Sequence, residues 1–286
     1  MLIKTLDYCR RRANFRGKFS GLDDPIETPE GADYWYAYPV QDFDYQHNSW
    51  GFRGPEYEQY IGKPVNICLG DSFTVNIGGP IEHSWCSQLA QRFDIPTLNF
   101  GMDGAGNDAI KLVYNEVSQA FDVVNCFVMY SYLHRRLVDG FFTSKLHEHE
   151  DNVAHFLSNR LHNVHEAAIP SIMYDNKELQ LLEDLGIYSQ PIERLECFSD
   201  QHRSLIDQDT YEILQGSTWP TYKEFMKGAE PHPDMYSEQF GKFVLKTVTY
   251  ANRDGFHSNK ETNKVYAEYF YNQWKLKNEP QNITQT

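Results

Sequence analysis

The chain has 286 residues, which is long enough to bury a large core in one domain, and its formal net charge is −14. Nucleic acids and anionic membranes attract basic patches, so this charge disfavours both as partners. No apolar run approaches the ~18 residues that a membrane span needs. The basic segment 1–18 also lacks the apolar stretch of a signal peptide. We therefore expect a cytoplasmic protein, and the composition predicts no particular oligomeric state.

Cysteine usage predicts a reduced chain without a metal site. The five cysteines are an odd number and include no C-x-x-C pair. Cys68 and Cys126 fall in apolar runs typical of strands, so both are expected to be buried as small apolar side chains.

Residues 1–60 are hydrophilic and aromatic, and we expect them to form a leader packed on the core. Within it, residues 34–39 predict an edge strand stopped by proline. Residues 48–56 read N-S-W-G-F-R-G-P-E, and their glycines suit tight turns. Arg53 is expected to pin the leader onto the core; the alternative is a contact with a carboxylate or a substrate.

Residues 65–74 read V-N-I-C-L-G-D-S-F-T and predict a buried strand that ends in a sharp turn. The turn places Ser72 at the carboxyl edge of a sheet, where open α/β sheets bind their ligands. A serine hydroxyl needs a base to take its proton. Far downstream, D-G-F-H places an acid, Asp254, three residues before an imidazole, His257. We predict that Ser72, His257 and Asp254 form a hydrolytic triad.

The two motifs, G-D-S-F-T and D-G-F-H, resemble those of the SGNH (GDSL) hydrolases in order, spacing and placement. The resemblance spans roughly residues 65–274. It implies a serine nucleophile, with the D-x-x-H motif supplying both the base and its orienting acid. It also implies a three-layer α/β/α sandwich around a flavodoxin-like, mostly parallel sheet. The N-S-x-G-F-R-G-x-E segment is similar to one in SGNH relatives of polysaccharide acetyl-modifying enzymes.

After Pro80, which suits a first helical turn, the apolar spacing predicts a helix over residues 81–93. Residues 97–100 predict a second strand that runs into the glycine-rich loop 101–106. This loop is not a G-x-G-x-x-G fingerprint, so we expect neither a dinucleotide nor any other cofactor. In the resembling family such a loop gives a backbone N–H to the oxyanion hole, together with that of Ser72. Gly104 is the best match for this role and Gly101 the second.

Asn107 follows the loop and has two possible roles. Asn107 or Asp108 is expected to cap a helix over residues 110–121, since both residue types favour that position. Alternatively, the Asn107 side chain donates to the oxyanion. The sequence leaves both roles open.

The apolar run 123–130 predicts a central parallel strand. After it the family carries G-x-N-D, whereas this chain has S-Y-L-H-R-R and lacks that asparagine. We expect substrate contacts or an oxyanion donor among the residues at the end of this strand and just after it: Tyr130, Ser131, Tyr132, His134 and Arg135. Asp71, next to Ser72, is a further candidate substrate contact.

The second half of the chain is less regular. Five histidines between residues 146 and 165 lack H-E-x-x-H and share no helical face, so they predict a solvated helix and not a metal site. Residues 171–175 predict a fourth strand. Residues 176–250 predict an irregular insertion over the site, which includes a helix over 178–185. Prolines at 220, 231 and 233 mark irregular chain within it. A capping box at 258–261 starts a last helix with a buried apolar stripe. We expect one SGNH-like domain over 61–278 and a disordered tail over 279–286.

The favoured hypothesis is a serine-dependent hydrolase of a small acyl ester, such as an O-acetyl group on a carbohydrate. An acyltransferase would use the same triad and differ only in the acceptor. The altered segment after residue 130 favours a third alternative, a non-catalytic binding or structural protein on the same fold.

Overall fold

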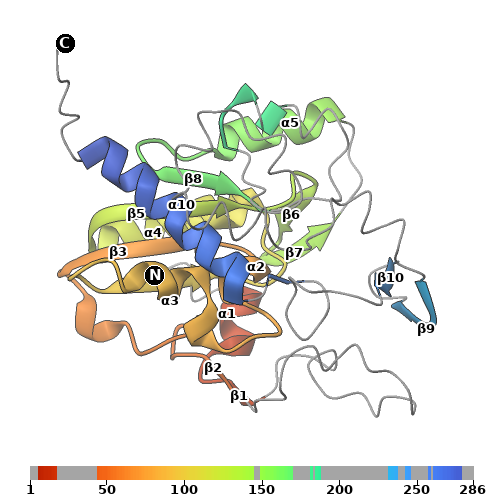
Figure 1. The fold of residues 1–286 in the computed structure, drawn as a ribbon, viewed down its shortest axis with the longest axis horizontal. Helices are drawn as coiled ribbons and strands as arrows, with labels where there is room; N and C mark the ends of the chain where they lie inside the picture. Colours follow the sequence, from red (N-terminus) through yellow and green to blue (C-terminus); the bar gives the residue numbers. More distant parts are fainter. Residues whose placement is uncertain are drawn as a thin grey trace.

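The computed structural model describes residues 6–17, 44–144, 149–169, 181–182, 184–187, 257–258 and 260–278, together with a hairpin at 231–237 and 242–245 (Figure 1). Its centre is a parallel sheet of four strands in the order β4-β3-β5-β8. The strands are β3 (Pro64–Gly70), β4 (Thr97–Gly101), β5 (Asp122–Tyr130) and β8 (His165–Ala168). Val65, Ile67, Cys68 and Leu69 are fully buried, as expected of a strand with helices on both faces.

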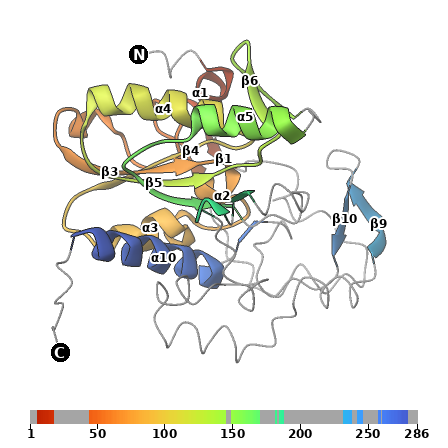
Figure 2. The same ribbon diagram turned by 90° about the horizontal axis from the view of Figure 1, so that it is seen from above.

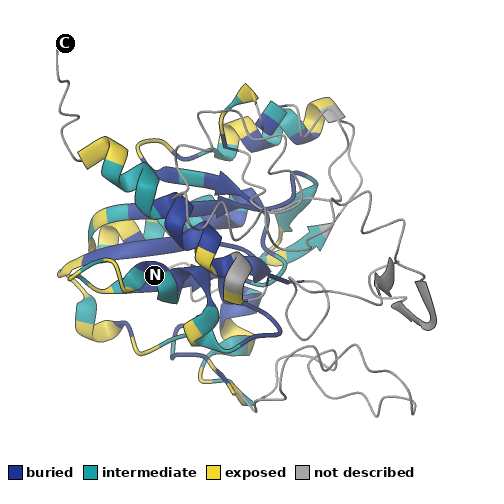
Figure 3. Ribbon diagram, in the orientation of Figure 1, coloured by how far each residue is buried: buried dark blue, intermediate teal, exposed yellow. Residues whose placement is uncertain are grey.

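Helices cover both faces of the sheet (Figure 2). On one face lie α4 (Asn107–Ala120) and α5 (His149–Asn159), and on the other α3 (Trp85–Ala90) and α10 (Lys260–Asn278). The predicted stripe of α10 is buried at Val265, Tyr266, Tyr269 and Phe270, so amphipathic spacing explains how this helix packs. The buried residues follow the sheet and the inner helix faces (Figure 3). The three-layer α/β/α sandwich with a flavodoxin-like parallel sheet is confirmed.

Shorter elements surround this core. They are α1 (Asp7–Arg12), β1 (Arg16–Gly17), β2 (Tyr45–Gln46), η3 (Glu58–Tyr60), α2 (Ser72–Val75), η4 (Ile81–His83), β6 (Arg135–Val138), β7 (Phe141–Ser144), β9 (Pro231–Ser237) and β10 (Lys242–Leu245). β9 and β10 form an antiparallel hairpin, so the prediction that Pro231 and Pro233 mark irregular chain is wrong. A strand with only one partner tolerates proline because part of its backbone needs no ladder hydrogen bond.

Two predicted elements differ from the structure. The helix expected over 81–93 is divided into η4 and α3, because Ser84 has an extended backbone and its hydroxyl accepts the Ser87 N–H at 3.1 Å. Ser84 is therefore an N-cap inside the predicted helix. The fourth strand is β8, which ends before residues 171–175; that segment lies outside the described residues.

The histidines of residues 146–165 do not share one solvated helix. His155 lies on α5 with its Nε2 atom 3.2 Å from Asp108 Oδ2. His165 is buried in β8, where its ring stacks on Phe127. The prediction of a solvated helix face is wrong for His165, since the chain turns into the sheet before reaching it.

Arg53 joins the leader to the turn that follows α2. Its guanidinium donates to the carbonyl oxygens of Val75 (3.1 Å), Asn76 (2.6 Å) and Gly79 (2.8 Å). It also stacks over the Tyr45 ring, and the side chain is almost fully buried. The prediction that Arg53 pins the leader is confirmed. The predicted edge strand at 34–39 and tail at 279–286 lie outside the described residues, as does most of the segment 176–250. Within the described chain, no helix combines the length and apolarity that a bilayer crossing requires.

Candidate active site

Ser72 is the first residue of α2, directly beyond the carboxyl end of the central strand β3. The turn depends on Gly70. A Cβ atom there would lie 2.1 Å from Thr74 Oγ1 and 2.9 Å from the Met129 carbonyl oxygen, so any side chain would prevent α2 from folding back over the strand end. Glycine at this position therefore sets where the serine lies.

The Asp71 side chain stabilises this turn through hydrogen bonds. Its carboxylate is fully buried and accepts the Phe73 N–H on Oδ1 at 3.1 Å, which caps α2. On Oδ2 it accepts the Ser131 hydroxyl at 2.7 Å and Arg135 Nη1 at 2.8 Å. These contacts join the ends of β3 and β5. Asp71 is thus a structural anchor for Ser72 and is not exposed for the substrate contact that the sequence suggested.

Two backbone N–H groups at this edge are available for an oxyanion. Met102 N–H donates to the Gly70 carbonyl at 3.0 Å, which holds the loop after β4 beside the end of β3. Gly104 on that loop has a φ of +79°, a conformation that favours glycine. Within the described residues, the N–H groups of Ser72 and Gly104 donate no hydrogen bond. Such free, fixed donors are what an oxyanion hole requires.

Asn107 is not a helix cap. It is the first residue of α4, the cap position is Gly106, and no side chain caps the helix. The buried Asn107 amide instead pairs with the backbone of Ser131. Its Nδ2 donates to the Ser131 carbonyl at 3.0 Å, and its Oδ1 accepts the Ser131 N–H at 2.9 Å. This pair of hydrogen bonds fixes the start of the segment after β5.

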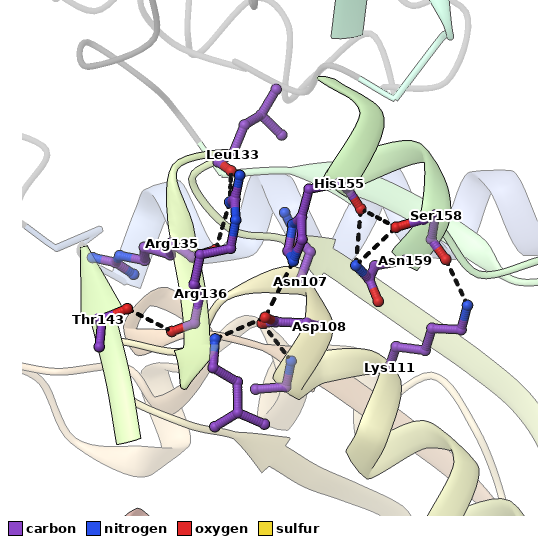
Figure 4. Close-up of polar contacts among 12 residues, drawn as sticks. Asn107, Asp108, Lys111, Leu133, Arg135, Arg136, Thr143, His155, Ser158 and Asn159 are labelled. Atoms are coloured by element: carbon purple, nitrogen blue, oxygen red, sulfur yellow. Dashed lines mark hydrogen bonds and ion pairs between the residues drawn. The ribbon is translucent and has the colours of Figure 1, made fainter. Parts of the chain in front are cut away.

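Asp108, the other predicted cap, joins α4 to its neighbours (Figure 4). Its Oδ2 accepts the Leu137 N–H of β6 at 2.7 Å and lies 3.2 Å from His155 Nε2 of α5. Burial raises the pKa of Asp108, but these contacts and the Ala109 N–H outweigh it and hold the pKa below its usual value. The Asp108 side chain therefore connects α4 to β6 and α5.

His257 lies at the same edge of the molecule as Ser72. It is buried, and its ring packs against that of Phe73, the residue after Ser72, with 4.9 Å between ring centroids. Phe73 therefore belongs to the same short helix as Ser72 and also contacts the imidazole ring of His257. Asp254, the predicted orienting acid, lies outside the described residues.

Asp103 is a site residue that the sequence analysis missed. It follows β4, next to Gly104, and burial raises the pKa of its carboxyl group. The charges of His257, Arg135 and Arg12 oppose that shift. No spacing rule connects residue 103 to residue 257, so only the fold identifies this neighbourhood.

A cavity of about 400 Å³ opens beside Gly104, between α1, the loop after β4 and β7. Its walls include Arg12 and Asp103, which carry opposite charges, and the rings of Tyr8 and Phe142, which stack at 5.7 Å. Both hydrogen-bonding and aromatic surface are therefore present next to the candidate oxyanion donor.

The remaining predicted residues divide between core and site. Tyr130 is fully buried, and its hydroxyl accepts the Leu161 N–H at 2.8 Å, which makes it a core residue and not a substrate contact. Arg135 reaches Asp71 and stacks over the Tyr132 ring at 4.6 Å. Within the described residues, no three side chains of His, Cys, Asp or Glu gather as metal ligands would.

No family model matches the chain, and no curated protein matches it significantly. Among solved structures it is similar to the psychrotrophic esterase EstA from Pseudoalteromonas: 14% identity over 74% of this chain and 97% of that one, with a TM-score of 0.35. It is also similar to a protein assigned to the lipolytic G-D-S-L family from Desulfitobacterium hafniense: 12% identity, 73% and 98% coverage, TM-score 0.32. A member of that family from Veillonella parvula is 18% identical over 24% of this chain and only 38% of that one, with a TM-score of 0.20. Likeness at this level does not extend to activity, so the function is inferred from the geometry of the site.

Proposed function

We propose that the protein hydrolyses a small acyl ester with Ser72 as the nucleophile, His257 as the base and Asp254 as the acid that orients the imidazole. The observation that supports this most is the arrangement at the carboxyl end of β3. The serine begins a helix there, and two undonated N–H groups, of Ser72 and Gly104, lie on the joined ends of β3 and β4. The first N–H groups of a helix have no acceptor within the helix, so this turn leaves the Ser72 N–H free to bind an oxyanion.

In this proposal the Ser72 oxygen attacks the acyl carbonyl carbon while His257 takes the hydroxyl proton. The carbonyl oxygen becomes an oxyanion, stabilised by the N–H groups of Ser72 and Gly104. The second N–H of the Asn107 amide, the one not given to Ser131, is a third donor. The carbon–oxygen bond to the alcohol then breaks, and the alcohol leaves with the proton from His257. Water attacks the acyl-enzyme by the reverse proton route, releasing the acid and restoring Ser72.

For the substrate we propose an O-acetyl group on a carbohydrate. Two features support it. One is the resemblance of residues 48–56 to a segment of polysaccharide acetyl-modifying relatives. The other is the cavity beside Gly104, where Arg12 and Asp103 offer a donor and an acceptor and Phe142 offers an aromatic face. Such walls suit a hydroxyl-rich, uncharged alcohol.

The test is turnover of p-nitrophenyl acetate and of an acetylated sugar by the purified protein. Ser72→Ala should abolish turnover of both without changing the circular dichroism spectrum. Ser87→Ala is a matched control, since Ser87 is a half-buried serine on α3 whose hydroxyl donates to the Ile81 carbonyl; it should keep wild-type rates. Equal turnover by wild type and Ser72→Ala would refute the proposal.

A further inference from the structure

Asn263, on the first turns of α10, contacts three separate segments around the candidate site. Its Nδ2 donates to the Ser258 carbonyl at 2.7 Å and to Asn76 Oδ1 at 3.0 Å. Its Oδ1 accepts the N–H of Trp85 at 3.1 Å. The side chain is fully buried. Both amide hydrogens and the amide oxygen are therefore used, and no water is needed to satisfy them.

Each segment that Asn263 contacts bears on the site. Ser258 is the residue after His257, the proposed base. Asn76 ends α2, the four-residue helix that begins with Ser72, and has a left-handed backbone with a φ of +61°. Trp85 is the first residue of α3, and its indole ring packs on Phe270 of α10. One amide thus joins the segment of the base to the helix of the nucleophile.

The Asn76 end of this link is itself fixed. Its Nδ2 donates to the Pro80 carbonyl at 2.6 Å, and its carbonyl oxygen accepts Arg53 Nη1 at 2.6 Å. A short helix held at both ends, by Asp71 and by Asn76, cannot rotate Ser72 freely. The Ser258 segment that Asn263 contacts is therefore held in a fixed position relative to Ser72.

We propose that Asn263 is a positioning residue, which sets the distance and angle between His257 and Ser72 through Ser258 and Asn76. The proposal rests on the function proposed above, because it assigns a purpose to the base–nucleophile pair. Two donated hydrogen bonds carry the coupling, and they are the ones that a carboxylate cannot make. An aspartate at position 263 keeps the acceptor for Trp85 but sets its second oxygen against the Ser258 carbonyl and Asn76 Oδ1.

Asn263→Asp is compared with Asn66→Asp, which makes the same chemical change at another fully buried asparagine. Asn66 bonds Thr97 and Asn125 within the sheet, and its partner in β4 is the first residue of that strand, far from the carboxyl edge. For Asn263→Asp we expect kcat on p-nitrophenyl acetate to fall by about 10²-fold, with KM within about twofold, because the reacting groups are misplaced while the substrate still binds. Asn66→Asp should lose thermal stability but keep kcat.

Losses of stability without loss of kcat in both variants would overturn the proposal, since Asn263 would then be an ordinary buried asparagine. A second measurement does not depend on turnover. In the ¹⁵N-labelled full chain, the imidazole signals of His257 should shift or broaden in Asn263→Asp and remain unchanged in Asn66→Asp. Unchanged His257 signals in both would refute the positioning role. If the wild type turns over no ester but the signals respond, the positioning holds and the proposed chemistry is what fails.

Discussion

Arg135 Nη1 lies 2.8 Å from Asp71 Oδ2, so the first residue of β6 is ion-paired with the residue before the candidate nucleophile. The carboxylate side of the pair has no solvent exposure, and Arg135 is only 17% exposed. A buried carboxylate needs a compensating charge, and the Ser131 hydroxyl supplies only a neutral hydrogen bond. The placement of Ser72 therefore depends on a cation from a different strand.

We predict that Arg135→Gln lowers the free energy of unfolding by about 3 kcal/mol, because it leaves the Asp71 charge buried and unpaired. Adding Asp71→Asn should restore part of the loss, since the uncompensated charge is removed. Urea unfolding measures both. Arg10→Gln is the control: Arg10 pairs with Asp7 at 3.4 Å but is 62% exposed, and its loss should cost less than about 1 kcal/mol. Equal losses for Arg135→Gln and Arg10→Gln would contradict the buried-charge argument.

His257→Ala should reduce kcat on p-nitrophenyl acetate as far as Ser72→Ala does, and the double variant should be scarcely slower than either. Members of a triad act as one unit, so their losses do not add. Asp254→Asn should be milder, because it changes the orientation of the base without removing it. Steady-state kinetics on the four variants decide the matter. Multiplying losses for the serine and histidine variants would show that the two residues serve different steps.

The pH dependence of stability should carry a contribution from His165. Burial, with the nearby charge of Lys277 adding to it, lowers the pKa of His165 to about 4. In the unfolded chain this pKa is about 6.5, so the unfolded state binds the proton first as the pH falls. The stabilisation is therefore complete above pH 6.5 and is lost between pH 6.5 and about 4, by up to about 1.4 kcal/mol per pH unit.

In His165→Gln the free energy of unfolding should fall less between pH 7 and pH 5 than it does in the wild type. Urea unfolding at the two pH values measures this difference. His162→Gln, at an exposed position three residues earlier, is the matched control and should leave the slope unchanged. An identical slope for wild type and His165→Gln would show that His165 does not contribute.

The parts of the fold that follow a strong local pattern could be predicted from the sequence. The run V-N-I-C-L followed by G-D-S gave β3 and the turn at Ser72, and the spacing of apolar residues gave the buried face of α10. β8 could not be predicted this way. Its sequence, H-E-A-A, has no β-branched residue and no alternation, and it is a strand only because it pairs with β5.

The polar contacts of the site could not be predicted from the sequence for a different reason. Asn263 bonds Trp85 across 178 positions, and Ser131 bonds Asp71 across 60. Spacing rules describe neighbours on one helix or strand, so they do not reach contacts that the topology alone creates. The same limit explains why Asn107 was expected to cap a helix. Its preference for that position is local, whereas its partner, Ser131, is 24 residues away.

Asn107 provides the last prediction, because its amide group donates one N–H to the Ser131 carbonyl and has a second N–H left for the proposed oxyanion. Asn107→Ala should lower kcat on p-nitrophenyl acetate by about 10²-fold with little change in KM, as expected for a donor that acts mainly in the transition state. It should also lower the free energy of unfolding by about 2 kcal/mol, since the buried Ser131 N–H and carbonyl lose their partner.

These two effects can be separated with Asn107→Asp, which keeps the acceptor for the Ser131 N–H and removes both donors. If Asn107 serves the oxyanion, the aspartate variant should lose as much kcat as the alanine variant, because a carboxylate near a developing negative charge is no better than no donor. If Asn107 only holds Ser131, the loss of stability will appear with kcat within about twofold of wild type, and Asn107 must be removed from the oxyanion hole. The N–H groups of Ser72 and Gly104 would then be the remaining proposed donors.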